Sequence, residues 1–391
     1  MVRDVNDAGP HNGYAEPMDP PDEKGGSGDD KGAGGPRDPS SQRIEQLFND
    51  QWKWISERTQ SDGKNWFQCE PPNRKYLITD RDGKGVLPAG KVGMIAGGGG
   101  TGKSLLLVQA AICVAAQHEL LGTFSVPISG PVLLAAGEED EDEIWRRLFG
   151  AARAMNLSPA EKEMVAKNIL PMPLCGKRVA LTYSLEELRQ IGGDLESLMD
   201  RGTPFAVELL RRLSGAGREW ALIILDPASR FAGPDVEIDN AAATRFIQAL
   251  ERFTEVPGNP TLLFSHHTTK ASRTGASDAV SARGASGLTD GVRWQANLDP
   301  VMDANDKRKT IPCLAKFRVT KSNYALYPPE VLLVRDSRHQ GFLRPATDAE
   351  KLDHQNAVDA AKNASGKKKS RPTVSDEDDG ADYSQEELVT F

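Results

Sequence analysis

Residues Val92–Ala116, VGMIAGGGGTGKSLLLVQAAICVAA, carry the strongest indication of the fold class. A short apolar run suited to a buried strand leads into a glycine-rich loop, and an apolar helix-forming segment follows. The loop matches the spacing G-x-x-x-x-G-K-[ST], in which backbone N–H groups surround phosphate oxygens, the lysine reaches the terminal phosphates and the serine binds Mg²⁺. We therefore predict a triphosphate site at Gly97, Gly98, Gly99, Gly100, Thr101, Gly102, Lys103 and Ser104.

The composition is that of an ordinary soluble protein in which additional polar segments lower the overall hydrophobic fraction. The chain has 391 residues, of which 38% are hydrophobic and 27% charged, and this length allows one large domain with tails or two domains. No apolar run approaches the ~20 residues of a membrane helix, and the first residues lack the apolar centre of a signal peptide. The four cysteines are far apart and fit no paired metal spacing. We expect a cytoplasmic protein with no membrane segment.

Charge divides the chain into three regions. Residues 1–43 are rich in Gly, Pro, Asp and Ser and carry 9 acidic and 5 basic side chains, so we expect a disordered leader. Residues 346–391 are expected to form a disordered tail, in which a basic run precedes an acidic tip with 7 acidic side chains. The tip is either a solvated tail or a segment that mimics nucleic acid or docks on a replication partner. Residues 44–365, which include the body, 44–345, are together near neutral, so DNA binding would require locally concentrated positive charge.

Two segments precede the phosphate loop. From Ile44 to Thr59 the apolar residues follow a rough helical spacing, which suggests a helix that packs on its own core or on a neighbouring subunit. Residues 76–88 lead into the first core strand, and we expect them to cover the outer edge of the nucleotide site.

Two further strands are predicted to end in carboxylates. Val132–Ala136 is followed by an acidic run that begins at Glu138, and Ala221–Leu225 is followed by Asp226. Carboxylates at the carboxyl ends of strands in an α/β sheet face the ligand crevice. Glu138, or its neighbour Glu139, could orient and deprotonate a water, although such a run also suits the first turn of a helix. Asp226 is placed to hold Mg²⁺ or its water.

The strand predicted at Thr261–Ser265 ends in His266 and His267. Neighbouring side chains on an extended chain point in opposite directions, so a polar sensor of the γ-phosphate is favoured over a metal site. Either histidine could be that sensor. The next segment, with Lys270 and Arg273, suits contact with a nucleic-acid backbone or is a neutral surface loop. Later, the pattern over Cys313–Pro345 predicts an antiparallel addition to the sheet.

The motifs GGGGTGKS, LLAAGEED with EIWRRL, IILDPASRF, LLFSHHTTK, ARGAS with GVRWQ, and KSNY together resemble the RecA-type hexameric replicative DNA helicases of the plasmid RepA family, which are AAA-like P-loop ATPases. The resemblance covers roughly residues 71–345. It implies an α/β fold, with a RecA-like P-loop NTPase core, a mostly parallel twisted sheet flanked by helices, and an antiparallel C-terminal extension. It also implies a hexameric ring that uses ATP to move along single-stranded DNA in plasmid or phage replication.

The resemblance assigns roles to individual residues. It makes Lys103 and Ser104 phosphate and Mg²⁺ ligands, Glu138 the catalytic base, Asp226 the acid on the Mg²⁺ side and His266 the sensor. Arg283 would be an arginine finger that reaches the adjacent subunit's pocket, with Lys321 assisting it. Two alternatives stay open: a filament-forming RecA-like ATPase of recombination or repair, and a nucleotide-switched DNA-binding scaffold without turnover.

Overall fold

The computed structural model describes residues 39–192, 202–268, 286–306, 309–325, 327–336 and 342–369. The chain divides into two units, residues 1–71 and 72–391, which are described separately. In the first unit, α1 spans Pro39–Gln51 and a short 3₁₀ helix spans Ile55–Glu57. The helix α1 begins inside the segment predicted to be a disordered leader. Its apolar residues are more than half exposed, at 57% for Ile44 and 58% for Leu47, so its docking surface stays a prediction.

The second unit is built on a nine-stranded sheet with the order β11-β10-β9-β8-β3-β7-β6-β4-β5. The six strands from β8 to β5 run parallel, and β9, β10 and β11 are added antiparallel. The strands are β3 (Val92–Gly97), β4 (Val132–Ala136), β5 (Ile169–Pro173), β6 (Leu222–Asp226), β7 (Thr261–His267), β8 (Trp294–Met302), β9 (Thr310–Ser322), β10 (Val331–Asp336) and β11 (Phe342–Pro345). This arrangement confirms the predicted fold class.

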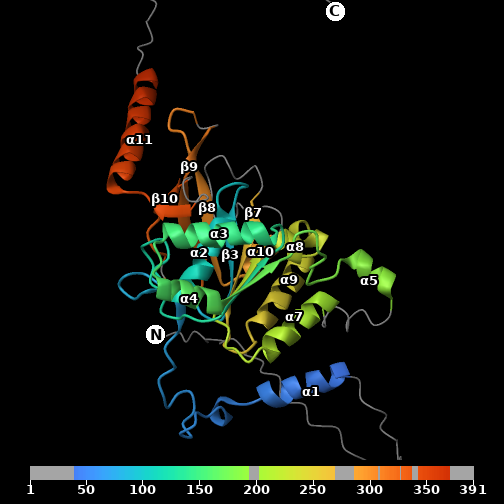
Figure 1. Ribbon diagram of the computed structural model, residues 1–391. Helices are drawn as coiled ribbons and strands as arrows, with labels where there is room; N and C mark the ends of the chain where they lie inside the picture. The colour runs from blue at the N-terminus through green and yellow to red at the C-terminus, as the bar shows by residue number, and fades with distance from the viewer. Residues whose placement is uncertain are drawn as a thin grey trace, which may run out of the picture. The chain divides into compact units, whose positions relative to one another are not determined.

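Helices cover both faces of the parallel strands (Figure 1). On one face lie α2 (Lys103–Ala116), α3 (Glu141–Ala154) and α4 (Pro159–Asn168), and on the other lie α7 (Pro204–Gly215), α8 (Ala228–Phe231), α9 (Asn240–Phe253) and α10 (Ser286–Gly291). The short α5 (Leu185–Ile191) precedes α7 in the chain, and a 3₁₀ helix (Pro234–Glu237) precedes α9. Because both faces are covered, the central strands are apolar without alternation: every residue of β4 and β6 is buried. None of the described helices combines the length and the apolar character needed to cross a bilayer.

The side chains of successive residues of β7 point to opposite faces of the sheet. Leu263 packs in the cluster that contains α2, whereas Leu262 and Phe264 pack in the cluster that contains α9. The ring of Phe264 meets that of Phe246 edge-on, with centroids 5.8 Å apart. This alternation decides which polar side chains at the end of β7 can face the phosphate loop.

A buried glutamine attaches the antiparallel extension to the core. The side chain of Gln109, on α2, donates to the Leu343 carbonyl at 2.8 Å and accepts from the Leu343 N–H at 3.0 Å. We expect Gln109→Met to leave both backbone groups unpaired and to lower the free energy of unfolding by about 2–4 kcal/mol. Urea denaturation measures this change. The exposed Gln355→Met should change it by less than about 0.5 kcal/mol, and equal effects would contradict the assignment.

The structure differs from the prediction in two further places. The strands β1 (Tyr76–Thr79) and β2 (Gly85–Pro88) form a separate antiparallel pair. Thr79 exchanges backbone hydrogen bonds of 3.0 and 2.9 Å with Ser125, which lies before β4. The pair therefore lies at the amino-terminal edge of the parallel strands and does not cover the nucleotide site, because that site forms at their carboxyl edge.

The second difference is at the C-terminal side. A helix, α11, spans Asp348–Lys369 within the segment predicted to be a disordered tail. Its start is fixed by a reciprocal cap: the Glu350 N–H donates to the Thr347 hydroxyl at 3.3 Å, and the Thr347 N–H donates to Glu350 at 2.8 Å. Arg344 also pairs with both oxygens of Glu350, at 2.8 and 2.7 Å. These local contacts stabilise a helix in a sequence whose polar composition alone suggested disorder.

Candidate nucleotide site at the phosphate loop

The loop between β3 and α2 has a conformation that requires glycine. Gly100 and Gly102 have φ angles of +75° and +99°, which side chains rarely adopt. At Gly97 an added Cβ would lie 2.5 Å from the Leu298 carbonyl oxygen. The loop ends at the amino terminus of α2, where unpaired backbone N–H groups and the helix dipole favour an anion. The loop backbone therefore has the geometry that a phosphate cradle requires.

Lys103 is held at the centre of this loop. Its Nζ donates to the carbonyl oxygens of Gly97 and Gly98, both at 2.9 Å, and lies 3.2 Å from Nδ1 of His267. Burial lowers the pKa of Lys103 to about 8, against the opposing effect of the carboxylates of Asp226 and Glu138. The ammonium group is therefore desolvated and close to its titration point, and an anionic phosphate would stabilise its charge.

The two predicted carboxylates lie near each other at the carboxyl edge of the sheet. β4 and β6 are adjacent and pair Ala136 with Asp226, so Glu138 lies two residues beyond that row. Asp226 is buried and accepts a hydrogen bond from the Ser265 hydroxyl. Glu138 is about half exposed, with 45% of its side chain accessible, and pairs with Nε of Arg230 at 3.1 Å. Both carboxylates line one pocket with Lys103 and Ser104.

These residues fit a nucleotide-bound Mg²⁺. The described residues contain no group of three or more His, Cys, Asp or Glu side chains that could form a complete metal cage. Mg²⁺ is usually bound by one or two protein oxygens, with substrate phosphates and waters completing its shell. The Ser104 hydroxyl and the Asp226 carboxylate in the same pocket provide such oxygens.

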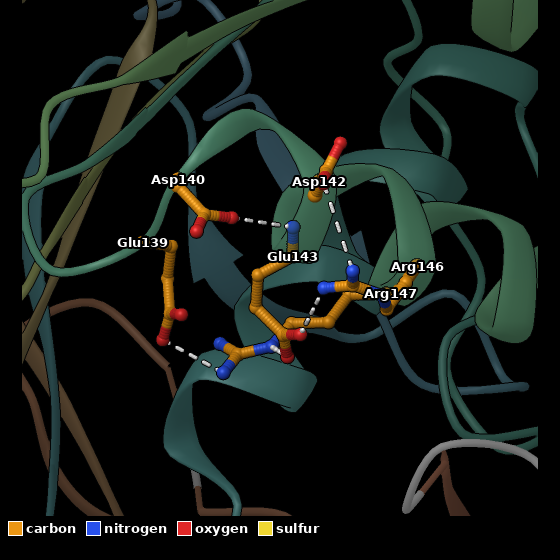
Figure 2. A network of polar contacts seen from close by, with 6 residues as sticks. All are labelled: Glu139, Asp140, Asp142, Glu143, Arg146 and Arg147. Atoms are coloured by element: carbon orange, nitrogen blue, oxygen red, sulfur yellow. Dashed lines mark hydrogen bonds and ion pairs between the residues drawn. The ribbon is translucent and has the colours of Figure 1, made fainter.

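Glu138 and Glu139 have different ion-pair partners. This difference makes Glu138 the better candidate for the general base. Glu139 is 23% exposed and forms an ion pair of 2.7 Å with Arg147, whose Nε also donates to Glu143 at 2.8 Å (Figure 2). Glu138 instead influences the charges of Lys103 and His267, whose pKa values its carboxylate raises. Glu138 therefore acts on the groups at the centre of the pocket, whereas Glu139 is held by α3.

The histidine that faces this pocket is His267, not His266. His267 lies on the same side of β7 as Ser265, and both line the pocket, whereas His266 is buried with the face that carries Phe264. Burial lowers the pKa of His266 to about 4, with smaller contributions from His267 and Lys103. Burial and the Lys103 charge also lower the pKa of His267. The sequence could not choose between these neighbours, because the choice depends on which face α2 covers.

Arg335 is among the pocket residues that the sequence did not indicate. Arg335, at the end of β10, donates to the Gly100 carbonyl at 3.1 Å and lines the pocket. It is separated from the loop by 235 positions, and β10 reaches the loop only because three antiparallel strands extend the sheet beyond β8. A lone arginine in a strand gives no signal of this contact.

Other predicted residues lie elsewhere or outside the described stretches. Lys321, on β9, donates to the carbonyl oxygens of Thr289 and Asp290 at 2.6 and 2.9 Å and does not line the pocket of its own chain. Burial lowers its pKa. Lys270, Arg273 and Arg283 lie outside the residues that the structure describes.

The lowered pKa of Lys103 predicts a pH dependence. Below pH 8 the free ammonium is already charged, so affinity for a triphosphate is nearly constant. Above pH 8 binding must take up a proton, because the phosphate raises the pKa of Lys103, so affinity falls by up to about tenfold per pH unit. Titrating a non-hydrolysable ATP analogue at pH 7, 8 and 9 measures this loss. Lys103→Met should flatten the profile, and constant wild-type affinity over this range would contradict the assignment.

Comparison with known proteins gives a family match over the pocket. A family model described as AAA domain matches residues 56–273, more than half of the 391 residues. This range includes Lys103, Glu138, Asp226 and both histidines, but not Arg335. A solved structure of an ATPase domain aligns with a TM-score of 0.43 and 11% sequence identity, over 66% of this chain and 85% of that chain.

Proposed function

The chain belongs to the AAA domain family, and from this premise we propose that it hydrolyses ATP at the phosphate-loop pocket and uses the energy to move a ring along single-stranded DNA as a helicase. One observation carries the hydrolytic part: Lys103, Glu138, Asp226 and His267, from four separate stretches of the chain, line one cavity of about 220 Å³. A cation, two carboxylates and a histidine around a glycine cradle are the groups that phosphoryl transfer to water requires.

The loop and the first turn of α2 bind the phosphates. Backbone N–H groups of the loop and the Lys103 ammonium neutralise the phosphate oxygens. Ser104 and Asp226 would hold Mg²⁺, which supplies positive charge to the phosphate chain when it is bound. Because Lys103 is held by the carbonyls of Gly97 and Gly98, it is already close to the cradle before any ligand arrives.

Glu138 is the general base for the attacking water. Glu138 lies two residues beyond Ala136, the partner of Asp226, and lines the pocket, and its ion pair with Arg230 holds it there. Since Arg230 shares that carboxylate, the pair must loosen for Glu138 to accept a proton. Asp226 is the less suitable base, because it is buried and accepts from Ser265.

His267 is the sensor of the terminal phosphate. Its lowered pKa keeps the ring neutral at pH 7. Because Lys103 donates toward Nδ1, the ring proton is on Nε2, which can donate to a phosphate oxygen. Loss of that phosphate would remove the acceptor and release the end of β7, which leads into the segment that contains Lys270 and Arg273.

The motor part of the proposal rests on the motifs after β7 and on the resemblance that they carry. Arg283 would complete the pocket of the adjacent subunit, with Lys321 assisting, so that hydrolysis depends on assembly into a ring, most simply a hexamer. Lys270 and Arg273 would contact the DNA backbone, and the acidic tip would dock on a replication partner. The replicon would be a plasmid or a phage.

The test combines phosphate release with a measurement of assembly mass. We expect release from Mg²⁺-ATP to rise when single-stranded DNA is added, and the chain to form closed rings that separate a forked duplex. Arg283→Ala should form rings that bind nucleotide but release little phosphate. Filaments on DNA in electron micrographs would contradict the helicase and favour a recombination ATPase. Nucleotide binding without any release would favour the scaffold.

A further inference from the structure

Two adjacent arginines on α3, Arg146 and Arg147, have different environments. Arg146 is 53% exposed and forms ion pairs of 3.7 Å with Asp142 and 3.4 Å with Glu143, outside the pocket. Arg147 is 19% exposed and lines the pocket with Lys103 and Ser104. A mostly buried guanidinium beside a phosphate cradle has no role in the hydrolytic scheme above.

The contacts of Arg147 orient it along the wall of the pocket. Figure 2 shows its guanidinium between the carboxylates of Glu139, at 2.7 Å, and Glu143, whose oxygen accepts from Nε at 2.8 Å. The Asp140 side chain accepts from the Glu143 N–H at 2.8 Å and so fixes the first turn of α3. These contacts engage Nε and one terminal nitrogen. A guanidinium has five N–H donors, so a further acceptor can bind without breaking either pair.

We propose that Arg147 is a second phosphate-binding cation supplied by the same chain as Lys103, held on Glu139 and Glu143 until the phosphate chain of the nucleotide arrives. The inference rests on the proposed function, because it assigns a further residue to the same site. Glu143 is then the positioning residue for the arginine, and the Glu139 carboxylate competes with the phosphate for it. The planar fork of arginine suits this task, because one edge can keep a carboxylate while the other donates to phosphate oxygens.

The charge of the pocket supports this role. Its ionisable lining comprises three cations, Lys103, Arg147 and Arg335, besides His267, and four carboxylates, Glu138, Glu139, Glu143 and Asp226. A pocket with more carboxylates than fixed cations repels a polyphosphate unless its cations turn toward the ligand. Arg147 is the cation best placed to do so, because Lys103 is already at the cradle and Arg335 is exposed and bonded to the Gly100 carbonyl.

The alternative is that Arg147 only anchors the loop after β4 to α3. The two roles predict opposite effects of Glu139→Gln. If Arg147 binds phosphate, removing the Glu139 charge frees the guanidinium and adds attraction for the ligand, so nucleotide binding stays equal or becomes tighter. If Arg147 only anchors Glu139, then Glu139→Gln and Arg147→Gln break the same pair and weaken binding to a similar degree.

The experiment measures binding of a non-hydrolysable ATP analogue with Mg²⁺ to the full chain by calorimetry. We expect Arg147→Gln to weaken binding about tenfold or more, because it removes charge-assisted bonds to phosphate. The matched Arg146→Gln should bind like the wild type. Glu139→Gln should bind equally or more tightly, and Arg147→Lys should recover part of the loss, because it restores the charge without the fork.

The outcomes separate this inference from the proposed function. If the wild type binds and Lys103→Ala does not, but Arg147→Gln binds like the wild type, the role of Arg147 is refuted and the nucleotide site stands. Weaker nucleotide binding by Glu139→Gln would also refute the role of Arg147. This second variant keeps the inference testable if Arg147→Gln fails to fold. If the wild type binds no analogue, the proposed function fails, and the inference fails with it.

Discussion

Replacing Glu138 with glutamine is expected to lower the kcat of ATP hydrolysis by about 10²–10⁴-fold, because the amide cannot accept a proton from the attacking water. Nucleotide affinity should be kept or increased, since the substitution removes a negative charge near Lys103 and leaves the phosphate cradle intact. Single-turnover phosphate release measures the chemical step, and calorimetry with a non-hydrolysable analogue measures binding. A falling kcat with unchanged affinity is the signature of a base.

Glu139→Gln is the matched control, because it removes the same charge from the next residue. Glu139 is tied to Arg147 at 2.7 Å, so its loss should change kcat by less than about tenfold, in contrast to the loss of a base. If Glu139→Gln abolished turnover and Glu138→Gln did not, the base would be Glu139, and the assignment from the geometry of the pocket would be wrong.

The second large effect is expected for Lys103→Ala. It removes the buried cation that lies within hydrogen-bond distance of the loop carbonyls and His267, and we expect phosphate release to fall at least about 10³-fold and duplex unwinding to cease. The folded chain should not lose stability, because burial depresses the pKa of Lys103 and its charge therefore opposes folding at pH 7.

Two measurements make this prediction specific. Thermal unfolding without nucleotide should give a Tm for Lys103→Ala equal to or above that of the wild type. The exposed Lys91→Ala, just before β3, should keep full activity. Strand separation by Lys103→Ala at the wild-type rate would show that the pocket does not drive the motor.

The sequence predicts the parallel core well because its signals are local. The run Val132–Ala136 coincides with β4, and the strand that ends at Asp226 is β6. Buried parallel strands are continuous apolar runs, and the glycine-rich motif fixes which strand comes first. Lys103 and Ser104 are fixed by the motif, and Glu138 and Asp226 follow from the rule that strand tips share one edge.

What the sequence does not predict depends on tertiary contacts. β8 was not predicted as a strand, because it buries two polar side chains, Gln295 and Asn297, the first donating to the second at 2.9 Å. The choice of His267 over His266 depends on which face of β7 meets α2. Arg335 reaches the loop through the order of the sheet. The Thr347 hydroxyl caps the start of α11, a helix in a segment whose polar composition gave no sign of it.

The most direct test of the central claim is steady-state phosphate release by the full chain from ATP, with and without Mg²⁺. We expect sustained turnover that needs Mg²⁺ and that Lys103→Ala abolishes. In Glu138→Gln the rate should fall to a small fraction of the wild-type rate while nucleotide still binds. Wild-type chain that binds the nucleotide tightly yet releases no phosphate, with or without single-stranded DNA, would contradict the claim.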